Sequence, residues 1–276
     1  MLTIKRKTLL YKSGAGSADY CINHVEGCSH GCNFPCYAML MKKMSGKIKD
    51  YNDWIKPKLV ENTLELLEKE LPRLKNKIRN VHLCFTTDPF MYKQPEVAEL
   101  TLKIMERLNE EGIKCTVLTK GIYPEELSDI KKYGKNNDYG ITIISLDEDF
   151  RKRYEPFTAP YEERIKSLRC LHDRGLKTHV SMEPYPTPNF VSQSLKEILE
   201  KINFVDKIIF GKLNYNKQPD NFSGVKEFYQ KCVDEVKDFC KKNEIECHIR
   251  YGTSEKEDKG KEKQIRKLNG VLPLPI

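Results

Sequence analysis

The 276-residue sequence has no long apolar run, which excludes a membrane-spanning helix, since that needs about 20 consecutive apolar residues. Its first residues, MLTIKRKTLLYKSGAG, carry charges and lack the apolar segment and small-residue cleavage site of a secretory signal. The sequence has no Gly-rich dinucleotide fingerprint after the first predicted strand, no internal repeat and no long Pro, Gly or Ser linker. We therefore expect a single cytoplasmic domain over residues 1–276.

Charge is unevenly distributed along the chain. The formal net charge is +8, and residues 1–58 hold ten Lys or Arg against four Asp or Glu. Such a bias is compatible with an anionic partner. We interpret it as a basic face around a ligand-binding mouth, with nucleic-acid binding as the alternative.

Short β-rich segments alternate with helical patterns along most of the chain. Strands are predicted at about 19–25, 79–86, 114–119, 138–146, 176–183 and 205–211. Apolar residues recur at intervals of three and four in the segments 95–111, 123–133, 160–174, 192–202 and 222–243. Strands that alternate with helices of this length pair in parallel through right-handed crossovers.

The alternation predicts an α/β fold, a partial (β/α)6 TIM-type barrel with parallel strands. Its core would run from about residue 15 to 215, followed by a helical C-terminal extension at about 216–276. An open doubly wound sheet is the structural alternative, although the missing dinucleotide fingerprint counts against it.

Polar residues follow the predicted strands. In chain order they are the segment 26–36, Thr86-Thr87-Asp88-Pro89, Thr119-Lys120, Ser145 and Met182-Glu183-Pro184. One such residue alone is commonly a helix cap or a turn residue. Five successive strand ends predict a site instead, because the active site of a parallel barrel collects at the C-terminal ends of its strands.

The segment GCSHGCNFPCYA places Cys28, Cys32 and Cys36 four residues apart. Gly31 and Pro35 interrupt any continuous helix through them, so we expect a loop that wraps a soft metal centre. Thiolates suit iron–sulfur clusters, zinc and copper(I). The ten cysteines of a cytoplasmic chain of this length do not predict a disulfide framework.

Two metal centres fit this spacing. A zinc site would need Cys21, His24 or His30 as its fourth ligand, and the second distant cysteine pair that is usual for closed zinc sites is missing. A four-iron cluster held by three cysteines would leave one iron open to bind a substrate or a cofactor.

The cysteine loop and the strand ends together resemble the radical S-adenosylmethionine (SAM) superfamily, whose usual loop is C-x3-C-x2-C. The nearest branch is the spore photoproduct lyase-like proteins. CSHGCNFPCYA, FTTDPF, VLTKG, SMEPYPTP and the stretch 143–176 carry the resemblance, which extends from about residue 20 to about 215. It implies a [4Fe-4S] cluster and SAM, with reductive cleavage of SAM to a 5′-deoxyadenosyl radical that abstracts hydrogen from a substrate.

The resemblance also implies individual roles. Cys28, Cys32 and Cys36 would ligate the cluster. Lys120 and the hydroxyl of Thr87 would bind the SAM carboxylate.

Further contacts follow for the rest of SAM. Ser145 would contact the ribose, Asp88 would meet the ammonium group, and Phe34 and Tyr37 would pack near the adenine. Glu183 would lie at the mouth, where it is a further candidate for ligand binding.

Glu155 and Arg164 lie in the most specific stretch of the resemblance, which extends from residue 143 to 176. An Arg near a helix start with an acidic partner is more often a structural pair than a ligand contact. Contact with SAM is the alternative for these two residues.

Two departures from the family pattern restrict the interpretation. The loop is C-x3-C-x3-C, one residue longer than usual, and Phe85 stands where the lyase has a hydrogen-donating cysteine. Lyase-type DNA repair is therefore an alternative. The expected substrate is anionic, a nucleotide or nucleic acid, and the expected electron donor is of the flavodoxin or ferredoxin type.

Two other functions are compatible with the residues alone. A zinc-stabilised nucleic-acid-binding module would explain the excess of Lys and Arg over Asp and Glu, but it would not explain the polar residues at the strand ends. An iron–sulfur protein that only transfers electrons would need a fourth thiolate, for which Cys21 is the candidate.

Overall fold

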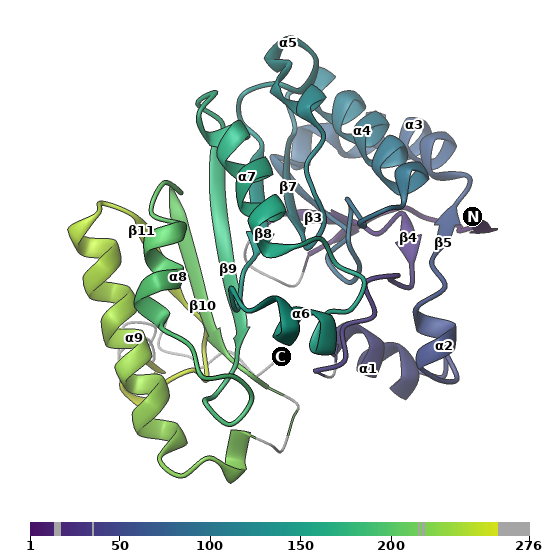
Figure 1. Ribbon diagram of the computed structural model, residues 1–276. Coiled ribbons are helices and arrows are strands. Elements are labelled where there is room, and N and C mark those ends of the chain that lie inside the picture. The colour runs from purple at the N-terminus through teal and green to yellow at the C-terminus, as the bar shows by residue number, and fades with distance from the viewer. Residues whose placement is uncertain (14–17, 35, 215, 217–218, 259–276) are drawn as a thin grey trace, which may run out of the picture.

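The computed structural model describes residues 1–13, 18–34, 36–214, 216 and 219–258 (Figure 1). Its main sheet has eight strands in the order β11-β10-β9-β8-β7-β6-β3-β2. They are β2 (Leu10–Lys12), β3 (Tyr20–Ile22), β6 (Asn80–Leu83), β7 (Lys114–Thr119), β8 (Asp138–Thr142), β9 (Lys177–Tyr185), β10 (Lys207–Lys212) and β11 (Glu246–Ile249). All neighbours from β3 to β11 are parallel, and β2 is antiparallel to β3.

A second, three-stranded sheet consists of β1 (Leu2–Ile4), β5 (Lys58–Val60) and β4 (Val25–Glu26), in that order. β4 leads directly into the cysteine loop. The small sheet therefore anchors the start of that loop.

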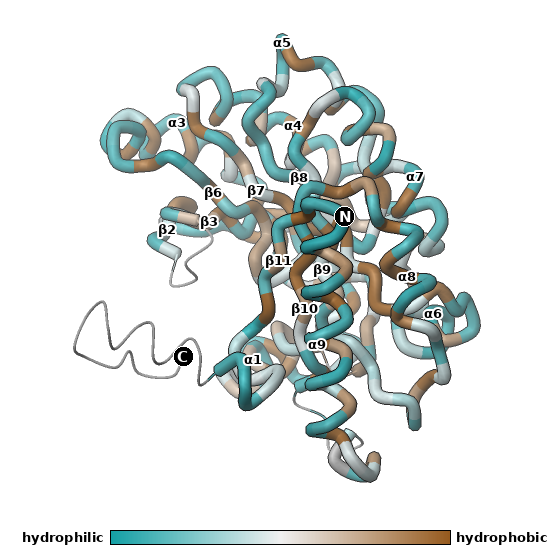
Figure 2. The backbone as a smooth tube through the Cα atoms, turned by 90° about the vertical axis from the view of Figure 1, so that its left-hand side faces the viewer, coloured by the Kyte–Doolittle hydropathy of each residue, from teal (hydrophilic) through white to brown (hydrophobic). Residues whose placement is uncertain are grey.

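Helices follow most of the parallel strands and cover one face of the main sheet (Figure 1). The longer ones are α3 (Thr63–Leu74), α4 (Pro95–Glu110), α7 (Tyr161–His172) and α9 (Val225–Lys242), and α8 (Leu195–Lys201), with seven residues, lies between α7 and α9 in the chain. The short ones are α1 (Tyr37–Met44), α2 (Tyr51–Trp54), α5 (Ile130–Tyr133) and α6 (Glu148–Tyr154), with 3-10 turns at η1 (Lys75–Lys77), η2 (Glu125–Ser128) and η3 (Pro219–Asn221). Figure 2 shows the hydrophobic residues concentrated in the central strands and the hydrophilic ones on the outer helices and loops.

The sheet has one apolar and one polar face, because successive side chains of a strand point to opposite sides. Val81, Val117 and Val180 belong to the buried core beneath the helices. The residues next to these valines along each strand, such as His82 and His179, lie on the opposite face of the sheet. We call this face the concave face.

The predicted α/β fold is confirmed, and the partial barrel with parallel strands is present. The six predicted strands correspond to β3 and β6 to β10. The C-terminal extension contains the expected helix, α9, and also β11, which the sequence pattern did not predict. β11 is short and half-exposed, so its pattern is too weak to stand out from a loop. The segment predicted as a helix at 123–133 forms only the short turns η2 and α5.

Within the residues that the structure describes, none of the helices is long and apolar enough to span a bilayer.

Candidate active site

The cysteine loop joins β4 to α1 and lies against the C-terminal side of the main sheet. Its backbone is held by contacts from distant segments: Cys28 N–H donates to Trp54 O at 2.9 Å, and Asn33 N–H donates to Tyr154 O at 3.0 Å. Gly31 is required where the loop is crowded, because a Cβ there would lie 2.9 Å from the Phe157 ring. The loop is therefore shaped by α2, α6 and the segment after α6.

Cys28, Cys32 and Cys36 are all partly exposed and form no disulfide. Burial in the loop, together with the charges of Asp88 and the neighbouring thiols, holds the pKa of Cys28 well above its usual value. Burial also raises the pKa of Cys32 to about 12, although the Lys120 ammonium opposes the shift. In both cases the neighbouring thiols of the loop add to the rise that burial causes.

The donor set fits a [4Fe-4S] cluster. Three thiols on one loop supply soft ligands, and a cluster bonds each thiolate to a different iron, so they need not converge on a single ion. In the described part of the chain, no three His, Cys, Asp or Glu side chains lie close enough together to share one metal ion. Pro35, inside the loop, lies outside the described residues.

The three residues proposed above as a fourth zinc ligand lie in other environments. Cys21 is buried in β3 beside His82 of β6. His24 is fully buried, with its Nε2 2.8 Å from Thr101 Oγ1.

His30 connects the cysteine loop to the β6–α4 segment. Tyr92 N–H donates to His30 Nε2 at 2.8 Å, so the ring proton lies on Nδ1, which is 3.4 Å from Asp88 Oδ2. Both ring nitrogens are therefore used within the protein.

Asp88 is buried and accepts hydrogen bonds from several groups at once. Its Oδ1 accepts from Thr119 Oγ1 at 2.6 Å and from Phe90 N–H at 2.9 Å, and its Oδ2 accepts from Lys120 N–H at 2.8 Å. Burial alone would raise the pKa of Asp88, but His30 and these donors hold it below its usual value. With its oxygens bound to protein donors, Asp88 is placed to position the cysteine loop and Lys120. Its contact with the SAM ammonium stays a prediction.

Lys120 follows β7 and lies close to the cysteine loop. Its ammonium pairs with Glu155 and lies 5.6 Å from the centroid of the Phe34 ring. Burial lowers the pKa of Lys120, but the charges of Cys32 and Glu155 outweigh this effect and raise it. The lysine therefore stays a cation beside the thiols, as binding of a carboxylate requires.

Glu155 links Lys120 to Arg164 in a buried charge triad. Its Oε2 lies 3.1 Å from Arg164 Nη2, and both side chains are completely buried. Arg164 also donates to Thr142 O at 2.9 Å and Ala159 O at 2.8 Å. The Arg164 guanidinium is thus occupied by protein acceptors, which supports the structural interpretation of this pair.

Phe34 is buried against α6. It stacks on Tyr154, with ring centroids 5.6 Å apart, and packs near Phe150 at 5.8 Å. Tyr37 begins α1 and is 47% exposed. The two aromatic residues predicted near adenine therefore lie in different environments.

Ser145 and Thr87 both lie in turns at strand ends. Ser145 is fully buried and accepts from Asp147 N–H at 3.0 Å, just before α6. Thr87 Oγ1 donates to Val25 O at 3.4 Å, beside the start of the cysteine loop. Their contacts with SAM stay predictions.

Glu183 lies near the end of β9 and pairs with Arg250, which follows β11, at 2.8 Å. Arg250 was not predicted from the sequence, because it follows β11, a strand that the sequence pattern did not predict. The bridging role of His30 was not predicted either. The only signal for this role in the sequence was the position of His30 between Cys28 and Cys32.

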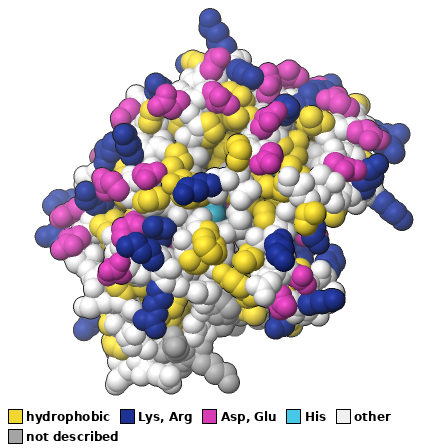
Figure 3. Space-filling view, turned by 45° about the vertical axis from the view of Figure 1, so that its right-hand side comes forward, with side chains coloured by type: hydrophobic (Ala, Val, Ile, Leu, Met, Phe, Trp, Pro, Cys, Tyr) yellow, Lys and Arg dark blue, Asp and Glu magenta, His cyan; other side chains and the backbone are white. Residues whose placement is uncertain are grey.

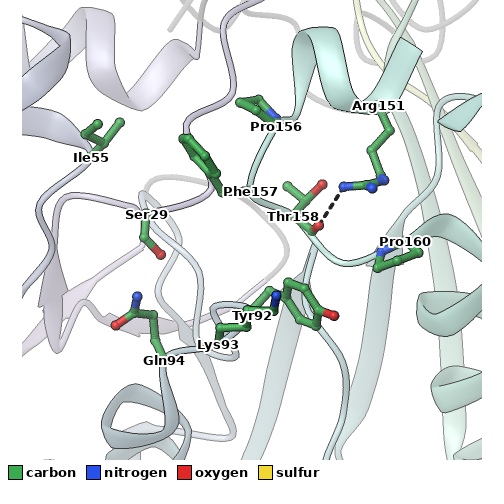
Figure 4. A pocket seen from close by; sticks show the side chains of 10 residues that line it. All are labelled: Ser29, Ile55, Tyr92, Lys93, Gln94, Arg151, Pro156, Phe157, Thr158 and Pro160. Carbon is green, nitrogen blue, oxygen red and sulfur yellow. Dashed lines mark hydrogen bonds between the residues drawn. The ribbon is translucent and has the colours of Figure 1, made fainter. Parts of the chain in front are cut away.

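A cavity of about 540 Å³ lies on the outer side of the cysteine loop (Figure 4). It is lined by Ser29, Ile55, Tyr92, Lys93, Gln94, Arg151, Pro156, Phe157, Thr158 and Pro160. Arg151 is fixed there by a 2.8 Å hydrogen bond to Thr158 O. Figure 3 shows hydrophobic side chains near the centre of one face of the molecule, with basic side chains beside them.

A sequence model of the radical SAM superfamily matches residues 22–202. An uncharacterised protein of Acidianus two-tailed virus is 27% identical over 213 residues, covering 72% of this chain and 68% of the viral one. An uncharacterised protein of Methanocaldococcus jannaschii is 26% identical over 184 residues, covering 67% of each chain.

Among solved structures, a spore photoproduct lyase complexed with dinucleoside spore photoproduct is similar at a TM-score of 0.65 and 15% identity. The match covers 90% of this chain and 80% of the lyase. A mutant of the lyase with bound AdoMet and the same dinucleoside has a TM-score of 0.66 at 14% identity, covering 91% of this chain and 81% of the lyase. At this identity the likeness shows a shared fold.

Proposed function

This chain belongs to the radical SAM superfamily, and from that premise we propose that Cys28, Cys32 and Cys36 hold its cluster. The protein is an enzyme, and its cofactors are a [4Fe-4S] cluster and SAM. When bound, they supply reductive cleavage of SAM, whose 5′-deoxyadenosyl fragment abstracts a hydrogen atom from a substrate. The observation that supports the assignment of ligands is the set of three thiols on one loop, with the partly buried ammonium of Lys120 close to that loop.

The chain's own residues would orient SAM over the strand ends. Lys120, kept charged by Glu155, would bind the SAM carboxylate, and Ser145 would meet the ribose hydroxyls. Asp88 would act indirectly, since it holds both His30 of the loop and the backbone of Lys120. Each group matches a different part of SAM in charge or hydrogen-bonding capacity.

We further propose an anionic substrate, a nucleotide or nucleic acid, on the concave face. His82 lies there with its Nδ1 buried and without a hydrogen-bond partner among the described residues. Burial, with smaller contributions from His179 and Arg250, lowers the pKa of His82 to about 4, so its ring is neutral at neutral pH. The exposed Phe85 ring lies 5.2 Å from the His82 ring and offers a surface on which a base can stack.

The lyase structures support this substrate class, since they hold a dinucleoside on the same fold. Phe85, rather than a cysteine, occupies the strand end here, so the lyase's repair reaction does not follow from that likeness.

The cluster assignment is tested on protein purified without oxygen. We expect about four irons per chain, in the ratio to sulfide of a [4Fe-4S] cluster. Dithionite and SAM should then yield 5′-deoxyadenosine, detected by chromatography. Cys32→Ala should abolish both, whereas the matched variant Cys21→Ala should keep both. Stoichiometric zinc without SAM cleavage would contradict the proposal, and loss of the cluster in Cys21→Ala would indicate an electron-transfer protein.

The substrate class is tested by binding of a fluorescein-labelled single-stranded oligonucleotide, followed by anisotropy. Arg250→Gln should weaken binding about tenfold, a change of about 1.4 kcal/mol, while dithionite-driven cleavage of SAM continues. The control is Lys241→Gln on the outer surface of α9. Equal affinity of the wild type and Arg250→Gln would contradict the proposed binding face.

A further inference from the structure

The cavity beside the cysteine loop lies apart from the groups assigned to the cluster and to SAM. Its volume of about 540 Å³ is within the range of small-molecule sites. The described residues that line it do not include the three cysteines, Lys120 or Ser145. Its walls are the outer side of the loop, the segment before α4 and the segment between α6 and α7 (Figure 4). The cavity is therefore a separate place for a small molecule.

Two aromatic rings from different segments border this space. Phe157 follows α6 and is 55% exposed, and Tyr92 lies just before α4. Figure 4 shows the two side chains on opposite sides of the space, with Ile55 at its edge. Aromatic side chains stack with other flat rings, so this part of the cavity suits a ligand with a planar ring.

Two cations line the same cavity. Arg151 is only 9% exposed, and it is fixed by a 2.8 Å hydrogen bond to Thr158 O and by Glu148. Within the described residues, the Arg151 Nη2 atom has no hydrogen-bond partner. Lys93 is exposed, and its ammonium lies 5.3 Å from the centroid of the Tyr92 ring. A fixed guanidinium with a free nitrogen is a donor for an anion in the cavity.

Further donors lie at the edge of the cavity. Gln94 is the N-cap residue of α4, and its side chain makes no capping hydrogen bond. The N-terminus of a helix of this length favours a negative charge. Ser29 Oγ has only a long contact, 3.7 Å, with the Met91 sulfur. Both side chains can therefore bind a ligand without breaking a strong bond within the protein.

The carboxylates nearest to the cavity are engaged elsewhere. Glu148 also accepts from Tyr161 N–H at 2.8 Å, and Glu96 pairs with the amino group of Met1 at 3.6 Å. Lys93 forms no ion pair with any described residue. The cavity thus keeps a positive charge, which a phosphate group with a charge of about −1.5 to −2 near neutral pH would balance.

We propose that this cavity binds a mononucleotide, with its base between Tyr92 and Phe157 and its phosphate near Lys93, Arg151 and the start of α4. A mononucleotide combines a planar ring with a phosphate, and these are the two groups that the two parts of the cavity fit. An uncharged ring compound or free phosphate fits only one part. The site lies outside the concave face, and the proposal does not depend on the cluster.

Isothermal titration calorimetry of the full-length protein with AMP measures this binding directly. Adenosine and inorganic phosphate are the comparison probes, since each carries one part of AMP. We expect both to bind at least about tenfold more weakly than AMP, because each loses the contacts of the other part. If adenosine or phosphate binds as tightly as AMP, or if AMP does not bind, the proposal is wrong.

Two variants test the two parts of the cavity. Lys93→Asn removes the charge at a position with a φ of 59°, a conformation that Asn adopts readily, and Phe157→Ala removes the exposed ring. Each should weaken AMP binding about tenfold. The matched control is Lys135→Asn, in an exposed loop before β8 at the opposite end of the strands, which should keep the wild-type affinity. Wild-type affinity in both Lys93→Asn and Phe157→Ala would overturn the placement of the nucleotide.

A second comparison separates this cavity from the SAM site, because AMP and SAM share adenosine. Saturating SAM, or the substitution Ser145→Ala, should leave the affinity for AMP unchanged. A tenfold or greater loss in either case would assign AMP to the SAM site and overturn the proposal. All of these outcomes are independent of SAM cleavage, so failure here would leave the proposed function untouched.

Discussion

Replacing Glu155 by Gln should destabilise the protein strongly, because Glu155 is the negative centre of a buried charge triad. The substitution keeps the shape of the side chain but leaves Lys120 and Arg164 facing each other without a counter-charge. Arg164 is completely buried, so water cannot replace the lost interaction.

Two estimates of the loss agree. Removing one partner of a buried ion pair costs about 3–5 kcal/mol. Burial alone would raise the pKa of Glu155, but Lys120 and Arg164 lower it from 4.5 to about 2. At about 1.4 kcal/mol per pKa unit, that shift corresponds to a contribution of about 3 kcal/mol to the free energy of unfolding near neutral pH.

The effect should depend on pH. Since the folded pKa lies below the unfolded value, the stabilisation is present above about pH 4.5 and is lost as the pH falls toward about 2. The difference between wild type and Glu155→Gln should therefore be largest at neutral pH and shrink below about pH 4.5.

Urea unfolding of the metal-free protein, followed by circular dichroism at several pH values, measures this difference. In thermal unfolding the same loss should lower the Tm by about 6–12 °C. The matched control is Glu99→Gln, which breaks an exposed pair with Lys103 on α4 and should change little. Equal stability of Glu155→Gln and wild type, or a difference that does not shrink in acid, would refute the reasoning.

Two other substitutions test the packing around the site. Asp88→Asn should lower stability by about 1–3 kcal/mol, since an amide N–H₂ would face the donors that the carboxylate now accepts, and it should reduce the iron bound per chain. Urea unfolding and iron analysis check this, and full iron occupancy would show that the His30 contact does not hold the cysteine loop. Gly140→Ala should cost about 1–3 kcal/mol, because its Cβ would lie 2.1 Å from the His179 ring; an unchanged Tm would contradict this packing.

The sequence was sufficient for the elements whose signal is local. Apolar spacing within α4, α7 and α9 and the β-rich runs of β6 to β10 predicted the parallel α/β barrel. β11 was not predicted, because its four residues are stabilised mainly by pairing with β10. Their own sequence pattern does not indicate that they pair with another strand.

The candidate site was likewise predictable from the sequence only in part. The spacing of Cys28, Cys32 and Cys36 and the polar strand ends were visible, since chemistry of this kind needs particular residue types at the ends of particular strands. The role of Asp88 was not visible, because its partner His30 lies 58 residues away in the sequence and is brought close only by the fold.

By itself, then, the sequence determined the fold class and the loop that carries three thiols, because periodicity and spacing express these directly. The superfamily followed from the resemblance of its motifs to a known family. The tertiary structure decided which charges are paired. It placed Glu155 between Lys120 and Arg164, saturated Asp88 with protein donors, and left α1 exposed and basic beside Cys36. Pairing and burial depend on distances between segments far apart in the chain, and no local pattern encodes those distances.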